Sequence, residues 1–384
     1  MGRKERKEII GKIEAHRKSK LLCYVTGDRS PITAQIGDDA VRPIFDHLRA
    51  FKKVSTLDLF IYSRGGAIDV PWRIVNAIRA ASDEWRILIP FRANSAATLL
   101  ALGADAIVMG KQGELGPIDP TLNTKRVVPG QNAIVQDAVS VEDVMAFVKF
   151  IQERCGLSEQ DAIATAAGKL IDRVDAVVLG SLYRTHSHIR DVARRTLLSR
   201  KQPPNDQVLT TIVQTLAEQV YAHGHAIGYE AATAIGLPVE QADDVLEPLM
   251  WALLEDYESE LKIREPLDPV AAVGTKDAYD EDACIAVVES AASVHRHVGR
   301  IEIRAKRQMP PQMNVNVNLS LQAPTLPQGM APQQAQQMLQ QLLQQAQPAL
   351  LQGAQQAVQD ALAKQAPLIG VDAAWRGGHW THEP

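Results

Sequence analysis

Cysteine is scarce in this chain, and long apolar runs are missing. Among 384 residues there are only three cysteines, Cys23, Cys155 and Cys284, which stand far apart. Metal sites and disulfide frameworks use closely spaced cysteines, so we expect neither, and a reducing compartment fits best. No segment approaches the roughly 20 apolar residues of a membrane-spanning helix, and basic residues recurring through Lys20 exclude a signal peptide. We therefore expect a cytoplasmic protein without a membrane span.

An excess of charge of one sign is also missing. The formal net charge is −4, with 22% charged and 46% hydrophobic residues, which is ordinary for a globular protein. The basic residues near the start are interleaved with acidic ones, which is typical of a solvated helix face. The composition therefore favours no nucleic-acid partner.

Strands and helices are predicted in alternation between residues 57 and 109. Apolar periodicity indicates strands at 57–62, 86–90 and 106–109, with helices at 70–81 and 95–102. Ahead of them, it indicates helices at 4–16 and 39–51 and a strand at 21–26. This alternation is typical of a parallel sheet with crossover helices, which carries its sites at the carboxyl ends of the strands.

We expect one catalytic domain with appendages. Residues 1–56 form its N-terminal part, and residues 57–265 form the core with a mainly helical extension after residue 141. Residues 266–323 are a short α/β extension, with strands expected at 298–304 and 313–320. The Gln-, Ala- and Pro-rich residues 324–384 read as a mobile tail or, through a leucine stripe at Leu339, Leu342 and Leu343, a self-associating one.

Two turns carry the expected chemistry, because each follows a buried strand. Gly65 and Gly66 allow the backbone to approach a ligand closely, so that N–H groups can point at an oxyanion. Ser95 opens a helix between small residues that permit a tight turn, and the N–H of Ala96 can donate to the same oxyanion. A simple helix N-cap is the alternative for Ser95. The Gly-x-Ser-x-Gly turn of α/β-hydrolases is absent, so the sequence disfavours that class of enzyme.

The order of these motifs resembles the serine dehydrogenase proteinase family, a relative of signal peptide peptidase A and, more distantly, of the Clp proteolytic subunit and the crotonases. The resemblance covers about residues 20–239. Its motifs are Asp58-Leu-Phe-Ile-Tyr-Ser-Arg-Gly-Gly66, Ala93-Asn-Ser-Ala-Ala-Thr98, Ala101-Leu-Gly-Ala-Asp-Ala-Ile-Val-Met109, Leu115-Gly-Pro-Ile-Asp-Pro120, Tyr221-Ala-His-Gly-His-Ala-Ile-Gly-Tyr-Glu-Ala-Ala232 and Ile235-Gly-Leu-Pro-Val239.

The resemblance implies a Clp/crotonase-like α/β fold of repeated ββα units with a parallel sheet. It also implies ATP-independent hydrolysis of peptide bonds through a Ser95 acyl-enzyme, with Gly65, Gly66 and Ala96 as the oxyanion hole. Peptide or protein substrates, no cofactor, no metal and a homo-oligomeric assembly follow from the same resemblance.

Three residues beside the turns, Arg64, Asn94 and Thr98, are candidate substrate contacts. Arg64 stands where related sequences commonly carry a proline. A cation beside the oxyanion turn could alter specificity, and a solvent-facing side chain is the alternative.

The general base that a serine nucleophile needs is left open. In relatives of signal peptide peptidase A it is a lysine on a later segment, whose pKa falls when it is desolvated. Lys169, which follows a glycine, matches that context better than Lys149, whose apolar neighbours are typical of a snorkelling surface lysine. We predict a Ser–Lys dyad with Lys169 as the base and Lys149 as the alternative.

A histidine base of the Clp type is doubtful, because no histidine lies between His47 and His186. Asp119 occupies about that place, where it could orient a base or only shape its turn. Later histidines remain available if the helical part folds over the site: His186, His188, His223 and His225. An i, i+2 pair on a helix points to different faces, so His186 and His188 do not predict a metal site.

Two other functions fit the same sequence. The chain could be a non-catalytic oligomeric scaffold or partner-binding module, with the Gln-rich tail as its contact element. It could also be a crotonase-like acyl-CoA enzyme, although residues 103–111 lack P-loop spacing and no adenine-binding signature is present. We rank the peptidase first, the scaffold second and the acyl-CoA enzyme third.

Overall fold

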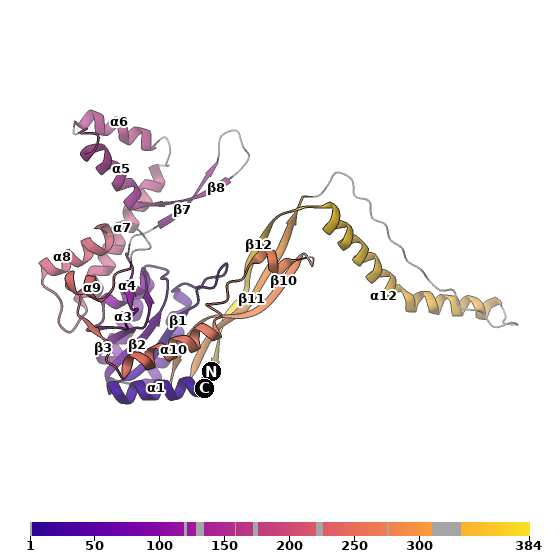
Figure 1. Ribbon diagram of the computed structural model, residues 1–384, viewed down its shortest axis with the longest axis horizontal. Coiled ribbons are helices and arrows are strands. Elements are labelled where there is room, and N and C mark those ends of the chain that lie inside the picture. Colours follow the sequence, from indigo (N-terminus) through magenta and orange to yellow (C-terminus); the bar gives the residue numbers. More distant parts are fainter. Residues whose placement is uncertain are drawn as a thin grey trace.

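A mixed α/β sheet forms the centre of the protein. The computed structural model describes residues 2–118, 121–127, 134–157, 159–171, 176–219, 226–274, 276–308 and 332–384. Within these residues the main sheet has the strand order β12-β11-β10-β1-β2-β3-β5-β9 (Figure 1).

The strands of this sheet divide into a parallel half and an antiparallel half. The parallel strands are β1 (Lys20–Thr26), β2 (Val54–Tyr62), β3 (Ser82–Ile89), β5 (Ala106–Met109) and β9 (Val239–Gln241). The antiparallel strands are β10 (Ala278–Ser290), β11 (Val294–Arg307) and β12 (Leu368–Glu383). The predicted parallel sheet is therefore confirmed.

Helices cover both faces of the parallel half. One apolar core joins alternate strand residues such as Leu22 and Leu59 to helices on that face. Those helices are α2 (Val41–Phe51, after the 3₁₀ turn Asp38–Ala40), α3 (Val70–Ala81), α4 (Ala96–Leu102), α7 (Ala176–Leu198), α8 (Asp206–Gln214) and α9 (Tyr229–Ala234). The opposite face, with Leu21 and Phe60, packs on α1 (Arg3–Arg17) and α10 (Leu246–Glu260). Burial on both faces explains the nearly continuous apolar strands.

A helical projection and a β-hairpin extend from one end of the molecule (Figure 1). They consist of β7 (Thr121–Val127), β8 (Ile134–Ser140), α5 (Val141–Glu153) and α6 (Gln160–Ile171). The described residues after 141 are mainly helical, and the helices continue through a π-helical turn at Thr215–Gln219. The β7–β8 hairpin was not expected from the sequence.

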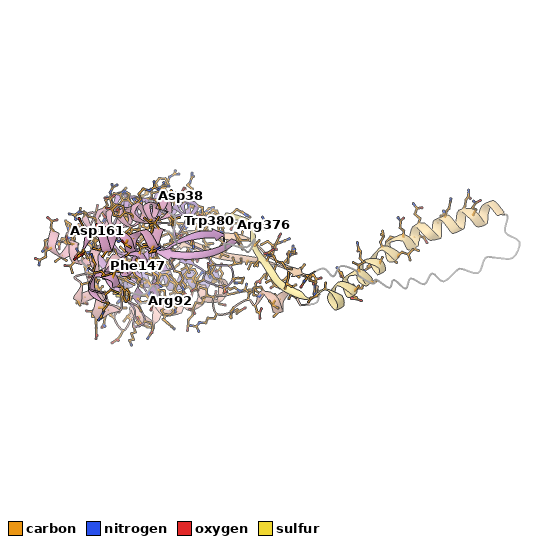
Figure 2. The ribbon with its side chains drawn as sticks, turned by 90° about the horizontal axis from the view of Figure 1, so that it is seen from above. Asp38, Arg92, Phe147, Asp161, Arg376 and Trp380 are labelled. Carbon is orange, nitrogen blue, oxygen red and sulfur yellow. The ribbon has the colours of Figure 1, made fainter. Side chains whose placement is uncertain are left out.

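The C-terminal region differs from the expectation of a tail. Its Gln-rich part forms the long helix α12 (Pro332–Gln365), which extends away from the rest of the molecule in Figures 1 and 2. The last strand, β12, then returns along β11 to the main sheet. The strand expected at 298–304 is confirmed within β11, whereas 313–320 and the leucine stripe of α12 lie outside the described residues and side chains.

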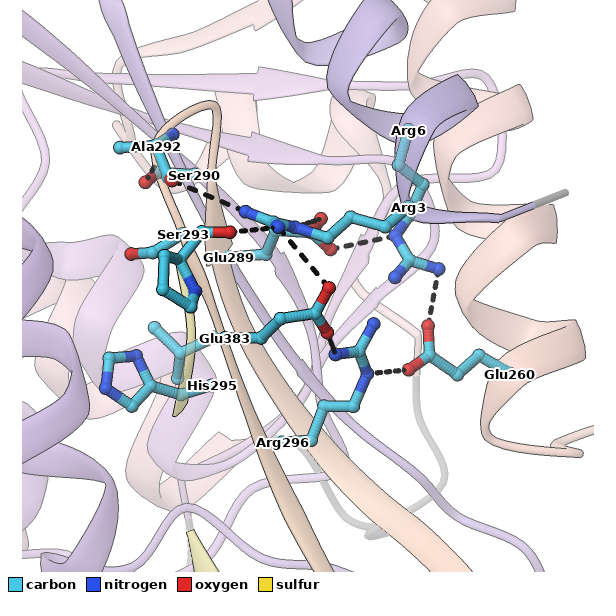
Figure 3. A network of polar contacts seen from close by, with 12 residues as sticks. Arg3, Arg6, Glu260, Glu289, Ser290, Ala292, Ser293, His295, Arg296 and Glu383 are labelled. Atoms are coloured by element: carbon cyan, nitrogen blue, oxygen red, sulfur yellow. Dashed lines mark hydrogen bonds and ion pairs between the residues drawn. The ribbon is translucent and has the colours of Figure 1, made fainter. Parts of the chain in front are cut away.

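A buried ion network fastens both chain ends to the sheet (Figure 3). Arg6 of α1 donates to Glu289 of β10 at 2.8 Å and to Asp256 of α10 at 2.7 Å, and it also pairs with Glu260. Arg296 of β11 bridges Glu260 and Glu383, each at 2.6 Å. Loss of one partner of the buried Arg6–Glu289 pair would leave an unpaired buried charge, so this pair fixes α1 on the sheet, whereas the Arg296–Glu383 pair is more exposed.

Candidate active site

The two predicted turns meet at the carboxyl edge of the parallel strands. Beyond β2, Ser63 bridges Ala93 of the short strand β4 (Arg92–Ala93). The N–H of Ser63 donates to the carbonyl of Arg92 at 2.9 Å, and the N–H of Asn94 donates to the carbonyl of Ser63 at 3.0 Å. The chain leading to Gly65 and the chain leading to Ser95 are thus held together by backbone hydrogen bonds.

Gly65 lies directly against Ser95. A β-carbon placed on Gly65 would lie 2.7 Å from the Cβ of Ser95 and 2.8 Å from the carbonyl oxygen of Asn94. The φ angle of Gly65 is +108°, a conformation that favours glycine. A β-carbon on Gly66 would be closer still to the backbone of Ile36, whose N–H donates to the Gly65 carbonyl at 2.8 Å. These contacts explain why this turn needs two glycines.

Ser95 occupies a strained position between β4 and α4. Its φ and ψ angles are 52° and −113°, which is unusual for a residue with a side chain. It stands at the N-cap position of α4, but its side chain makes no capping hydrogen bond. The alternative of a simple N-cap is therefore not what the structure shows. The side chain is partly exposed, whereas Ala96 and Ala97 after it are buried.

The backbone amides around Ser95 differ in whether they already donate a hydrogen bond within the protein. The N–H of Gly65 donates to the Ser63 hydroxyl oxygen at 3.0 Å, and that oxygen also accepts from Thr26 at 2.8 Å. Among the described residues, none accepts a hydrogen bond from the amide of Gly66 or Ala96. Of the three predicted oxyanion donors, Gly66 and Ala96 are therefore the two whose amides have no acceptor among the described residues.

Thr98 supports the turn from inside. Its side chain is fully buried, and its hydroxyl oxygen lies 2.7 Å from the carbonyl oxygen of Ala93 and 2.9 Å from that of Gly116. The same oxygen accepts from the N–H of Gly116 at 3.1 Å. A buried side chain offers a substrate no surface, so we assign Thr98 a positioning role in place of the expected substrate contact.

A charged cluster borders the Gly65 turn. Arg64 donates to Asp28 at 2.6 Å, the hydroxyl of Tyr62 donates to the same carboxylate at 3.1 Å, and Arg92 pairs with Glu114 of the short strand β6 (Glu114–Leu115) at 3.2 Å. The side chain of Arg64 is 53% exposed, whereas that of Asp28 is only 8% exposed. The outer rim of this cluster is therefore cationic. Asn94 is partly exposed beside it.

The structure does not bring Lys169 next to Ser95. Lys169 is exposed on α6, which packs against α5 and lies far from α4 in Figure 1. Lys149 lies on α5, but its side chain is outside the described part of the chain, as is Asp119.

The later histidines divide between α7 and an undescribed segment. His186 and His188 lie on α7, which packs on α3 and α4, and His188 lies 2.5 Å from Asp69 at the start of α3. The spacing of Asp69 and His188 in the sequence gave no signal for this contact. His223 and His225 lie outside the described residues. The chain on either side of them is anchored beside the site, since Leu216 and Ile227 bond to Ile118 and Leu115 respectively.

Two features are absent from the described residues. No helix among them is both long enough and apolar enough to cross a membrane. They also contain no group of three or more His, Cys, Asp or Glu side chains that could hold a metal ion.

The arrangement is that of an α/β protein presenting a serine at a strand-to-helix turn on the carboxyl edge of a parallel sheet. Residues 2–144 match the family described as ClpP-like SDH-type serine proteinase. The resemblance seen in the sequence motifs is thus confirmed for this part of the chain.

Two similar proteins are described as uncharacterized. One from Methanocaldococcus jannaschii is 25% identical over 233 residues, covering 61% of this chain and 68% of the relative. Another from the same organism is 27% identical over 124 residues, covering 31% of this chain and 42% of the relative. The chain therefore spans less than half of the second relative.

A solved structure also shows a distant likeness. A protein described as an enoyl-CoA hydratase from Streptomyces coelicolor A3(2) is 15% identical, with a TM-score of 0.27, covering 66% of this chain and 79% of that protein. At this score the likeness carries no argument about function.

Proposed function

We propose that this chain is an ATP-independent serine peptidase of the Clp/crotonase type of fold, with Ser95 as the nucleophile. The observation that carries the proposal is the contact between Gly65 and Ser95, which joins the serine turn to the glycine turn at one sheet edge. The strained backbone of Ser95 supports it, because nucleophilic serines at strand-to-helix turns are held in this way. The match of residues 2–144 to a serine proteinase family points to the same reaction class.

The chemistry would follow the acyl-enzyme route. The Ser95 hydroxyl oxygen attacks the carbonyl carbon of the scissile peptide bond while its proton passes to a base. The amides of Gly66 and Ala96 donate to the oxyanion, and the N-terminus of α4 adds a favourable partial charge. The C–N bond then breaks, the leaving amine takes the proton, and water releases the acyl group from Ser95. No step needs a metal or cofactor.

We propose a Ser–Lys dyad with Lys169 as the base and Lys149 as the alternative. Both lysines belong to the α5–α6 projection. In this arrangement Lys169 would accept the proton of Ser95 in its own chain only after the projection has moved. Alternatively, it would accept the proton of Ser95 in another copy of the chain. Lys169→Gln and Lys149→Gln, compared with Lys12→Gln on the exposed face of α1, would distinguish the two lysines by the pH dependence of hydrolysis.

The substrate would lie across the rim formed by Arg64 and Asn94. Because the exposed member of the Arg64–Asp28 pair is the cation, we propose that acidic peptide side chains near the scissile bond bind best. We further propose a cytoplasmic setting, which the three free cysteines support.

The decisive experiment uses a fluorophosphonate probe, which reacts with activated serines. The wild-type chain should be labelled on Ser95 and should hydrolyse unstructured protein, whereas Ser95→Ala should lose both activities. Ser55→Ala, at an exposed position on β2, should behave as wild type and serves as the matched control. Labelling or hydrolysis that persists in Ser95→Ala would remove Ser95 from the mechanism.

A further inference from the structure

The last strand of the chain forms one edge of the main sheet. β12 pairs with β11 along one side, and no described strand pairs with its other side. The strand is 16 residues long, whereas the opposite edge strand, β9, has three residues. A long edge strand offers a row of unpaired N–H and C=O groups as a template for another strand.

The devices that usually protect such an edge are few here. Residues 368–383 contain no proline and no lysine. The pairing of β12 with β11 is irregular near residues 377–379 and at residue 368, but it runs without interruption from Gly370 to Arg376. Along this regular stretch of seven residues, none of the described strands pairs with the outer side of β12.

The edge is also held in place before any partner arrives. The side chains of Val371 and Trp375 pack in a small apolar cluster with Val273 of α11 (Pro269–Val273) and Ile301 of β11. Near the C-terminus, Trp380 donates to Asp39 at 2.8 Å, and Glu383 pairs with Arg296, as Figure 3 shows for the latter contact. Docking of a partner strand would therefore cost little conformational entropy in β12.

The charges along the strand match a second copy of the same strand. Side chains alternate between the faces of a strand, so Asp372, Ala374 and Arg376 lie on one face. In an antiparallel pair of two copies centred on Ala374, Asp372 of each copy stands opposite Arg376 of the other. Within the same chain Asp372 also pairs with Lys306 at 2.5 Å and Arg376 with Glu302 at 3.9 Å, but both side chains stay well exposed, at 65% and 69% respectively. Opposite charges at facing positions stabilise such a pair.

The same charges disfavour the two registers whose centres lie two positions to either side. Centring the pair on residue 372 would set two aspartates against each other, and centring it on residue 376 would set two arginines against each other. We propose that β12 is the docking edge for β12 of a second copy, which joins two sheets across a two-fold axis at Ala374. The interface is isologous, so each copy contributes the same residues. This proposal does not depend on the peptidase activity.

A cysteine at the axis tests the register directly. Ala374→Cys would stand opposite the same cysteine of the second copy, with Cα atoms about 4.5–5.5 Å apart, which is within disulfide range. In a Cys155→Ser background, which removes the exposed native cysteine, mild oxidation of Ala374→Cys should give a disulfide-linked dimer. Gly370→Cys is the matched control, because its counterpart in the other copy lies eight positions along the strand. Equal cross-linking of the two variants overturns the register.

Charge reversal tests the interface without relying on disulfide geometry. Arg376→Asp and Asp372→Arg should each weaken the dimer at least tenfold in sedimentation experiments on the full chain, and the double variant should restore it. Arg42→Asp, an exposed change on α2, should leave the dimer unchanged. A wild-type chain that stays monomeric, or an assembly that survives both single reversals, overturns the proposal. The dimer measurements do not depend on Ser95 labelling. A failure of the dimer proposal can therefore be distinguished from a failure of the peptidase proposal.

Discussion

At Gly65, a single hydrogen atom in place of a side chain lets the glycine turn touch the serine turn. The nearest atoms to a β-carbon there include the carbonyl oxygen of Asn94 and the amide nitrogen of Ala96, which are backbone and cannot move aside cheaply. The position of Ser95 thus depends on the absence of a side chain at Gly65.

Gly65→Ala should separate the two turns. The added methyl group would overlap Ser95 and would also be strained at a φ of +108°, so we expect a loss of about 1–3 kcal/mol of stability. Fluorophosphonate labelling of Ser95 should slow at least tenfold, because the oxyanion donors no longer face the hydroxyl. Denaturant unfolding and the labelling rate measure the two effects.

The matched control is Gly168→Ala in α6. A β-carbon there meets no atom within 4 Å, and alanine is the better helix former, so stability should change by less than about 1 kcal/mol, towards greater stability. If Gly65→Ala labels as fast as Gly168→Ala, the close approach of the two turns has no catalytic role.

At the scale of elements, three short segments hold the serine in its strained conformation. β4 pairs in parallel with β6, and the hydroxyl of Thr98 on α4 links the end of β4 to Gly116 after β6. A β-carbon on Gly116 would lie 2.9 Å from the Cβ of Asn94, so these segments are in close contact. Strained conformations persist only where the surrounding structure determines them in this way.

Thr98→Val keeps the shape of the side chain but removes the hydroxyl. The buried N–H of Gly116 would lose its acceptor, which should cost about 1–3 kcal/mol of stability. We expect slower labelling of Ser95 as the turn loosens, with peptide affinity less affected, since Thr98 does not reach the surface. Thr98→Ser retains the hydroxyl and should recover most of the labelling rate. A valine variant as fast as wild type would mean that α4 alone fixes Ser95.

The bounds of the elements around the site could be predicted from local sequence pattern. The helix at 70–81 and the strand at 106–109 have the predicted bounds, because their apolar periodicity reflects burial on one or both faces. The same reasoning missed β10 and β12. Much of each strand is exposed or half-buried and carries charged residues, so the apolar signal is weak, and the pairing of both strands is set by distant strands.

At the scale of the whole molecule, a histidine cluster joins α2 to the antiparallel half of the sheet. The Nε2 atom of His47 lies 3.2 Å from the carbonyl oxygen of Val288, which can only accept, so Nε2 carries the proton and Nδ1 accepts from Ser290 at 2.8 Å. The same Nε2 lies 3.0 Å from Nδ1 of His295, and His382 of β12 packs against His295. Both rings of the pair His47–His295 are thus built into the fold in the neutral form.

Acid should weaken the fold through these rings. Burial, together with the nearby His295, lowers the pKa of His47 from 6.5 to about 4. Between these values the unfolded chain binds a proton that the folded chain does not, so stability falls as the pH drops from about 6.5 to about 4. The loss from His47 is on the order of 3 kcal/mol, and burial also lowers the pKa of His295, which adds in the same direction.

Urea unfolding at several pH values between 7.5 and 4 measures this effect. His47→Gln should be less stable at neutral pH but should lose much less stability on acidification than wild type. His379→Gln, at an exposed position on β12, should keep the wild-type pH dependence. Equal slopes for His47→Gln and wild type would show that other groups cause the acid sensitivity.

The sequence by itself determined the alternation of strands and helices, the parallel half of the sheet, and the placing of a serine and two glycines after successive strands. These features arise from local periodicity and from turn residues, which each segment carries within itself. Only the tertiary structure decided that Thr98 is buried, that Lys169 lies far from α4, and that β12 forms one edge of the sheet. Those outcomes depend on contacts between residues far apart in the chain, such as Arg6 with Glu289, for which no local pattern exists.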